Sequence, residues 1–294
     1  MGEARPTIAL EEGTDPAALR PAVVVVNPSS GSAGDLDAGD LRVRELRDGE
    51  DLERVMGELA DEGAAVLGMA GGDGSVGCAA GVAVERDRVL LALPGGTLNH
   101  FSRELGVETV EAGRRALDAG RVARVDVAEV SGRVFVNNAS VGVYGEIVDR
   151  RERLEGRMPK RLALLIACLR VLRAAPKLSI TVDGRPERVY LLFVGNDVYE
   201  GLGMGGRRSL QEGLLDVRVL PARSHAALLA ALWRVATGSA RRGGWLRRWT
   251  CTEVTVEVPA GTKLAHDGEV REAAGPLVFR SRPGALRVVV GGDA

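Results

Sequence analysis

Residues 64–84 read AAVLGMAGGDGSVGCAAGVAV, and this stretch carries the strongest indication of the fold. Its first seven residues are an apolar run typical of a buried strand, and Val76 to Val84 form a helix-like segment. Between them lies a turn of glycine and small polar residues, Gly71-Gly72-Asp73-Gly74-Ser75. A strand, a glycine-rich turn and a helix in this order predict a parallel α/β sheet, which binds its ligands at the carboxyl ends of its strands.

The same pattern recurs on both sides of this stretch. Ala22 to Val26 is an apolar β-branched run, and the turn Asn27-Pro28-Ser29-Ser30-Gly31 follows it. Arg88 to Leu93 is a third apolar run, and it leads into Pro94-Gly95-Gly96-Thr97-Leu98-Asn99. Three strands that each end in a glycine-rich turn should place those turns side by side at one edge of the sheet.

The pattern changes in the second half, where segments alternate apolar and polar residues. Two pairs of such segments flank Ser131-Gly132 and Asp183-Gly184, dipeptides that favour tight hairpin turns. Alternation continues as far as Ala285 to Val290, and helices are expected at residues 159–174 and near 226–236. This half therefore predicts an antiparallel β-sandwich or a curled sheet.

These patterns divide the chain into two lobes. We expect an α/β lobe over residues 21–122 and a β-rich lobe over residues 123–275. Residues 276–294 contain a C-terminal strand that could pack back on the N-terminal lobe. The residues before Leu19 are expected to form a loose tail.

The composition argues against several classes of protein. A net charge of -1 and an aromatic content of 3% argue against a nucleic-acid partner, which requires basic surfaces or stacking platforms. The three cysteines lie far apart, at positions 78, 168 and 251, so neither a disulfide framework nor a zinc site is expected. No signal-peptide pattern is present, and the longest apolar run, Leu162 to Leu169, is too short to span a bilayer. We expect a soluble cytoplasmic protein.

The three glycine-rich turns have the chemistry of a phosphate site. Glycine lets the backbone approach a ligand closely, and successive backbone N–H groups can then face one anion. Serine and threonine hydroxyl groups add donors, and the N-terminus of a following helix adds partial positive charge. Any one turn alone would be ordinary strand-to-helix connection, but three at one sheet edge predict a cradle for a polyphosphate.

A dinucleotide site is the competing interpretation. Gly72-x-Gly74-x-x-Gly77 matches its glycine pattern after a strand and before a helix. However, Asp73 would place a carboxylate beside the pyrophosphate, and the acidic residue expected about 20 positions later is missing. A second match begins at Gly201 but precedes a strand rather than a helix. No Walker A motif or protein-kinase catalytic loop is present.

Taken together, these motifs resemble the diacylglycerol kinase catalytic family, which includes soluble bacterial lipid kinases and sphingosine kinases and is related to the NAD kinases. The resemblance extends over nearly the whole chain in the right order. Its motifs are Asn27-Pro28-x-Ser30-Gly31, Gly71 to Ser75, Pro94-x-Gly96-Thr97-x-Asn99-x-Phe101-x-Arg103, Val125-Asp126-Val127, Gly195-Asn196, Glu212-Gly213-Leu214-Leu215-Asp216-Val217 and Asp267-Gly268-Glu269. The resemblance implies an α/β nucleotide-binding lobe and an antiparallel β-sandwich lobe that binds lipid.

The resemblance also assigns roles to residues. It implies that the ATP phosphates are bound by Asn27, Pro28, Ser29, Ser30, Gly31, Gly71, Gly72, Gly74, Ser75, Thr97 and Arg103. Asp73 would engage Mg²⁺ and help to activate the lipid hydroxyl, and Glu269 would act as the general base. A carboxylate suits the first role because Mg²⁺ needs hard oxygen ligands. Without the resemblance, Asp267-Gly268 fits a plain hairpin turn.

Two further sites are implied only by the resemblance. Asp126 and Asn99 match residues near the acceptor headgroup, although Asp126 fits an exposed strand residue nearly as well. A structural Mg²⁺ site would consist of the Glu212 carboxylate with the backbone carbonyl groups of Ser209 and Leu214. Glu212 replaces an aspartate of the bacterial relatives and is one methylene longer, so this metal site stays open.

The chain departs from the family pattern at several positions. A lysine, an asparagine, a threonine and an aspartate of the family are replaced by Ser32, Gly77, Glu45 and His100. Ser75 replaces a threonine, which is a mild change. None of these substitutions removes Asp73 or Glu269. They nevertheless leave open a regulator that binds nucleotide or lipid without catalysis.

We therefore expect ATP-dependent transfer of a phosphoryl group to a lipid hydroxyl, with diacylglycerol as the first candidate acceptor. A sphingoid base, a polyprenol and an NAD-kinase-like activity are the alternatives. A lipid acceptor implies peripheral membrane contact, and Arg157 to Lys177 and Arg241 to Trp249 mix basic with apolar residues. The first segment equally fits a helix on the sandwich core, and the second a loop with packed tryptophans. A homodimer is left open.

Overall fold

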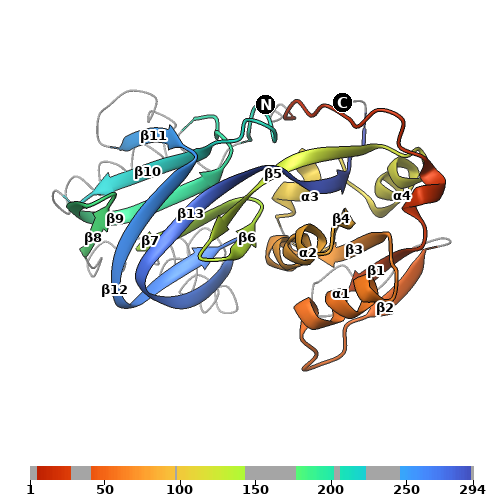
Figure 1. Cartoon of the computed structure of the whole chain (residues 1–294), viewed down its shortest axis with the longest axis horizontal. Coiled ribbons are helices and arrows are strands. Elements are labelled where there is room, and N and C mark those ends of the chain that lie inside the picture. Colours follow the sequence, from red (N-terminus) through yellow and green to blue (C-terminus); the bar gives the residue numbers. More distant parts are fainter. Residues whose placement is uncertain are drawn as a thin grey trace, which may run out of the picture.

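The computed structural model describes residues 5–27, 41–96, 98–142, 177–201, 206–222 and 246–292 of the chain. They form two lobes that share one 13-stranded sheet (Figure 1). The helices predicted at residues 159–174 and near 226–236 lie outside the described residues. Across the part that is described, no helix has both the length and the apolar character needed to cross a membrane.

The N-terminal lobe is a parallel sheet flanked by helices, as its sequence pattern predicts. Its strands are β1 (Ala22–Val26), β2 (Arg42–Glu45), β3 (Val66–Gly71) and β4 (Val89–Pro94), in the order β4-β3-β1-β2. Its helices are α1 (Leu52–Asp61), α2 (Asp73–Glu85), α3 (His100–Glu104) and α4 (Val110–Asp118). All five residues of β1 are buried, which explains why its sequence is a continuous apolar run rather than an alternating one.

The C-terminal lobe is an antiparallel β structure, and this prediction is also confirmed. Its strands are β5 (Val122–Val130), β6 (Arg133–Phe135), β7 (Asn138–Gly142), β8 (Leu178–Val182), β9 (Arg185–Asn196), β10 (Leu215–Pro221), β11 (Arg247–Cys251), β12 (Glu253–His266) and β13 (Glu269–Val289). Ser131 and Gly132 have φ values of 48° and 83°, and Asp183 and Gly184 have 47° and 77°. Two consecutive positive φ values are required by the tight hairpin turns predicted at these dipeptides.

Strand β13 joins the two lobes. It pairs antiparallel with β12 and β5, and near its end Arg287 and Val288 pair in parallel with Val89 and Leu90 of β4. The sheet therefore continues from one lobe into the other, as the long blue strand of Figure 1 shows. The lobe boundaries near residues 122 and 275 stay a prediction.

The prediction of a loose tail before Leu19 is wrong for residues 5–19. Thr7 forms a bridge with Ser209 of the C-terminal lobe, and Leu10 forms one with Ala123. Ile8 is 6% exposed and belongs to the core of the N-terminal lobe. This segment carries no periodic pattern because its partners are distant in sequence rather than neighbours, so the pattern alone could not reveal its position.

Candidate active site between the lobes

The glycine-rich turns lie together at one edge of the parallel sheet. The register pairs Val26 with Ala70 and Gly71 with Pro94, so the carboxyl ends of β1, β3 and β4 are neighbours. A Cβ atom added at Gly96 would lie 2.5 Å from the Cα atom of Gly72. The second and third turns are thus in direct backbone contact, which only glycine permits. Residues 28–31 of the first turn, and Thr97, lie outside the described residues.

Asn99 folds the third turn. Its Oδ1 atom accepts a hydrogen bond of 2.8 Å from the backbone N–H of Gly96, and its Nδ2 atom donates one of 2.8 Å to the carbonyl of the same residue. Its φ of 51° is left-handed, a conformation that asparagine tolerates better than most residues. Contact between Asn99 and lipid stays a prediction. Arg103 is exposed on α3, and its contact with phosphate also stays a prediction.

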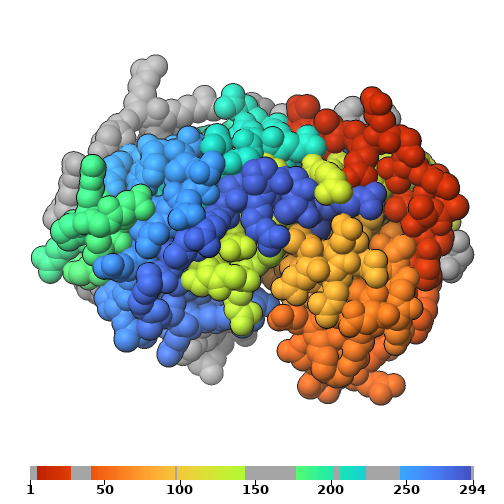
Figure 2. Space-filling view, viewed as in Figure 1, coloured from red at the N-terminus to blue at the C-terminus, as the bar shows by residue number. Residues whose placement is uncertain are grey.

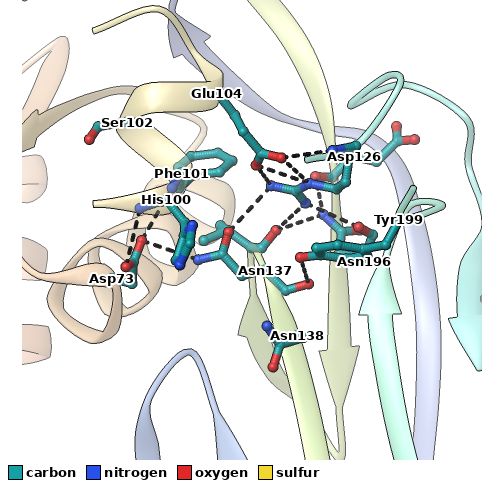
Figure 3. A network of polar contacts seen from close by, with 12 residues as sticks. Asp73, His100, Phe101, Ser102, Glu104, Asp126, Asn137, Asn138, Asn196 and Tyr199 are labelled. Atoms are coloured by element: carbon teal, nitrogen blue, oxygen red, sulfur yellow. Dashed lines mark hydrogen bonds and ion pairs between the residues drawn. The ribbon is translucent and has the colours of Figure 1, made fainter. Parts of the chain in front are cut away.

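Asp73 connects both lobes. It is the first residue of α2, and its carboxylate accepts hydrogen bonds from the backbone N–H groups of His100 (3.3 Å) and Phe101 (3.2 Å) at the start of α3. It also accepts a hydrogen bond of 3.3 Å from Nδ2 of Asn137 in the C-terminal lobe (Figure 3). Three donors on one carboxylate fix its orientation.

Asp267 forms part of a hairpin turn and also has a buried carboxylate. The turn joins β12 to β13, with φ values of 44° at Asp267 and 91° at Gly268. The carboxylate accepts hydrogen bonds from the backbone N–H groups of Val136 (2.7 Å), Asn137 (2.8 Å) and Asn138 (3.2 Å). Burial raises the pKa of Asp267 to about 7; these three donors oppose that shift, and the charge of Asp73 adds to it.

Gly77 provides the room for this carboxylate. A Cβ atom at position 77 would lie 2.5 Å from Oδ2 of Asp267. Packing therefore explains why this chain has Gly77 where the family has an asparagine. It allows the β12–β13 turn of the C-terminal lobe to lie directly against α2.

Glu269 reaches the same helix from the C-terminal lobe. A Cβ atom at Gly74 would lie 3.2 Å from Cγ of Glu269 and 3.6 Å from its Oε1 atom. The side chain is 43% exposed and forms an ion pair of 3.0 Å with Arg271. It lines a groove together with Gly74, Gly77 and His266, and Figure 2 shows this groove between the orange and gold surface of the N-terminal lobe and the lime and blue hairpins. Glu269 thus lies against Gly74, the residue that follows Asp73, although the two carboxylates come from different lobes.

Arg207 is a site residue that the sequence interpretation missed. Its side chain is fully buried and forms an ion pair with Glu104 of α3. It donates further hydrogen bonds to the carbonyl groups of Val136 (2.7 Å) and Asn196 (3.0 Å) and to Oδ1 of Asn137 (3.3 Å). The adjacent carboxylates raise its pKa, against the effect of burial. Its sequence context, between glycines and another arginine, gives no signal of burial.

The residues of the implied structural metal site also form hydrogen bonds within the protein. The carbonyl of Leu214 accepts a hydrogen bond of 2.9 Å from the N–H of Asp197, and the hydroxyl of Ser209 accepts one of 3.0 Å from Gln211. The carboxylate of Glu212 accepts a bond of 3.3 Å from the N–H of Val198. Within the described ranges, no group of three acidic, histidine or cysteine side chains could hold a metal ion. Metal binding here stays a prediction.

Asp126 is buried rather than exposed on its strand. Its carboxylate accepts hydrogen bonds from the N–H groups of Gly213 (2.5 Å) and Gly284 (2.7 Å). Burial and the nearby Asp126 carboxylate raise the pKa of Asp197 to about 8. Contact between Asp126 and a lipid headgroup stays a prediction.

Comparison with known proteins accounts for both halves of the chain. Residues 21–130 match the sequence model of the diacylglycerol kinase catalytic domain, and residues 137–290 match the YegS C-terminal NAD kinase beta sandwich-like domain. A relative from Pseudomonas aeruginosa strain PAO1, named probable lipid kinase YegS-like, is 30% identical over 265 residues, which cover 87% of each chain. A relative of the same name from Alcanivorax borkumensis is 27% identical and covers 78% of this chain and 80% of its own.

Solved structures agree on the fold. A structure from Bacillus anthracis strain Sterne, titled as that of a diacylglycerol kinase, is similar with a TM-score of 0.63 and 18% identity. A second structure from the same organism has a TM-score of 0.71 and 19% identity, and it covers 92% of this chain and 97% of its own. At these identities the likeness shows the two-lobe architecture.

Proposed function

Because this chain belongs to the lipid kinase family that carries a diacylglycerol kinase catalytic domain, we propose that it transfers the γ-phosphoryl group of ATP to a hydroxyl of diacylglycerol. The observation that carries the proposal is the position of Glu269, from the C-terminal lobe, against Gly74, the residue that follows Asp73 in the glycine-rich turn. The two carboxylates come from different lobes, so a nucleotide on one wall and an acceptor on the other would meet between them.

The described residues fit a nucleotide with Mg²⁺. A Cβ atom at Gly72 would meet only the Cα atom of Gly96, at 3.9 Å, so the second turn borders open space where phosphates could lie. Oδ2 of Asp73 accepts only one hydrogen bond and so keeps acceptor capacity, and Mg²⁺ is commonly held by one or two carboxylates together with phosphates and water. When bound, the ion would neutralise phosphate charge.

Glu269 is suited to act on the acceptor. It belongs to the C-terminal lobe and is half-exposed in the groove, so a lipid hydroxyl could reach it. There it would take the hydroxyl proton as the phosphoryl group is transferred. Asp73, which belongs to the N-terminal lobe and is fixed by three donors, would act on MgATP instead. The two carboxylates therefore have separate roles in this proposal.

The test is phosphorylation of a lipid panel with radiolabelled ATP, using diacylglycerol, a sphingoid base and a polyprenol. Glu269→Gln should lower turnover by about 10²–10⁴ while nucleotide binding survives, which is the usual contribution of a general base. Asp73→Asn should weaken Mg²⁺-dependent nucleotide binding as well. The control is Glu272→Gln, which changes an exposed carboxylate of the same strand. Nucleotide binding without phosphorylation of any lipid would favour a regulator. Binding of NADH without binding of ATP would favour a dehydrogenase.

Peripheral membrane contact belongs to the same proposal. Trp249 packs against the core of the C-terminal lobe, with the Arg247 guanidinium 4.9 Å from its ring centroid. Trp245 and residues 157–176 lie outside the described residues. Anionic vesicles in the lipid assay would reveal such contact as co-sedimentation of the protein.

A further inference from the structure

The amide of Asn137 bridges the two lobes. Asn137 follows β6, is 5% exposed, and donates from Nδ2 to Oδ1 of Asp73 at 3.3 Å. Its own Oδ1 atom accepts a hydrogen bond of 3.3 Å from Arg207. Figure 3 shows the Asn137 side chain between Asp73 and the network below Glu104. One amide thus connects a carboxylate of the nucleotide lobe with a buried cation.

Hydrogen-bond chemistry fixes the orientation of this amide. A guanidinium group can only donate, and an ionised carboxylate can only accept. The oxygen of the Asn137 amide must therefore face Arg207, and its NH₂ group must face Asp73. An aspartate at this position would face Asp73 with a second negative charge. An apolar residue would leave Asp73 without this donor and Arg207 without this acceptor.

The remaining contacts hold Arg207 and Asn137 in place. Arg207 is tied to Glu104, and its guanidinium lies over the rings of Phe101 (5.9 Å) and Tyr199 (5.4 Å). The backbone of Asn137 donates to Asp267 and accepts a hydrogen bond of 3.0 Å from the hydroxyl of Tyr199. These contacts anchor the bridge from both sides.

The contacts form a closed ring. Phe101, whose N–H donates to Asp73, and Glu104, which pairs with Arg207, both lie on α3. From Asp73 the ring therefore runs through α3 to Arg207, then through Asn137 back to Asp73. We propose that Asn137 and Arg207 are positioning residues of phosphoryl transfer, which fix the Asp73 carboxylate for MgATP. This inference rests on the proposed function.

Asn137→Asp is the sharpest test because it separates positioning from folding. The new carboxylate keeps the size of the side chain and can still accept from Arg207, so the ligand-free protein should still fold, with a urea midpoint lowered only by the repulsion between Asp73 and the new carboxylate. Asp73 loses a donor and gains a repelling neighbour. We expect the kcat/KM for MgATP to fall about tenfold to hundredfold, in line with loss of a hydrogen bond to a charged group. Mg²⁺-dependent ADP affinity, measured by calorimetry, should fall as well.

Arg207→Met removes the cation, and Arg218→Met is its matched control. Arg218 is another buried arginine of the same lobe, paired with Asp216 at 2.6 Å. Both variants should lower the urea midpoint, but only Arg207→Met should also lower ADP affinity. Equal ADP affinities for the two variants would overturn a positioning role for Arg207.

The decisive measurement is the effect of Asn137→Asp in the Asp73→Asn background. If Asn137 acts through Asp73, the second change should alter ADP affinity and kcat/KM less than about threefold there, since neighbouring residues in one network are not additive. A full additive loss would overturn this inference alone, as would wild-type kinetics of Asn137→Asp. A wild-type protein that phosphorylates no lipid would overturn the proposed function and this inference with it.

Discussion

The candidate active site has two sides, here called its N-terminal and C-terminal walls after their lobes, and they are built in different ways. On the N-terminal wall, the turns after β3 and β4 present backbone, and Gly72 and Gly96 touch through their main chains. On the C-terminal wall, buried side chains hold the backbone in place, with Asp267 accepting from three consecutive N–H groups and Arg207 spanning three segments. One wall depends on the absence of side chains, and the other on their presence.

This difference explains how each wall responds to change. A wall made of backbone tolerates no added atom where two turns touch. A substitution there removes few side-chain hydrogen bonds, because few polar side chains take part. A wall made of buried polar groups has space for substitutions of equal size, but each lost partner leaves a donor or acceptor without a hydrogen bond. The predictions below test these two sensitivities.

Gly96→Ala should have the largest effect. The added Cβ atom would lie 2.5 Å from the Cα atom of Gly72, so one turn must move away from the other. Overpacking of this kind typically costs about 1–3 kcal/mol, and a displacement of about 1 Å at a catalytic turn can lower the rate about 10²-fold. Urea denaturation and lipid phosphorylation would measure the two effects.

Gly72→Ala is the matched control for this change. Its φ of -78° suits alanine, and its Cβ atom would meet only Gly96 Cα at 3.9 Å. The variant should fold with wild-type stability and lose only nucleotide affinity. If both alanine variants are equally unstable, contact between the turns is not the cause.

Asp267→Asn should have the next largest effect, on stability. The carboxylate accepts three backbone N–H groups, but an amide offers one acceptor oxygen and places an NH₂ group among those donors. We expect the free energy of unfolding at pH 8 to fall by about 2 kcal/mol, since an unsatisfied buried donor costs about 1–3 kcal/mol. Glu269→Gln, in a half-exposed neighbour, should leave stability unchanged. Equal stability of the two variants would contradict the difference between the walls.

The Asp126–Asp197 pair predicts a pH dependence behind the C-terminal wall. Burial and Asp126 raise the pKa of Asp197 to about 8, from an unfolded value of 3.8. Between these values the folded state keeps a proton that the unfolded chain has lost, so stability should fall as pH rises from about 4 to 8. Asp197→Asn has an NH₂ group in place of that proton, and it should be more stable than wild type at pH 8 by about 1 kcal/mol or more.

Urea denaturation at pH 5 and pH 8 would measure this difference. The wild-type protein should lose more stability between the two pH values than the asparagine variant, although the raised pKa of Asp267 gives both proteins some slope. Parallel pH profiles for the two proteins would show that Asp197 does not hold the proton.

The sequence predicted those parts of the molecule that depend on neighbours in the chain. β1, β3 and β4 were predicted from short apolar runs, and the hairpins at Ser131 and Asp183 from dipeptides whose backbone preference is local. Asn137 and Arg207 escaped prediction because their partners lie in other segments: 64 positions separate Asn137 from Asp73, and 103 separate Arg207 from Glu104. Burial of a polar side chain depends on such distant contacts.

The N-terminal segment, which forms bridges with Ser209 and Ala123, should respond least. Glu11 pairs with Arg287 (2.8 Å) and Arg124 (3.2 Å), and the hydrogen bond from Arg287 is the main cause that lowers its pKa. Glu11→Gln should cost about 0.5 kcal/mol at pH 7, as expected of a partly exposed ion pair.

The pH dependence of this contribution should be opposite in sign to that of Asp197. A lowered folded pKa gives stability that is present above the unfolded value of 4.5 and is lost as pH falls through the folded value. Urea midpoints of Glu11→Gln and wild type should therefore differ at pH 7 and converge near pH 3. Glu12→Gln, at the exposed neighbouring position, is the control and should match wild type throughout. A Glu11→Gln defect that persists at pH 3 would show that the side chain acts through packing rather than through its charge.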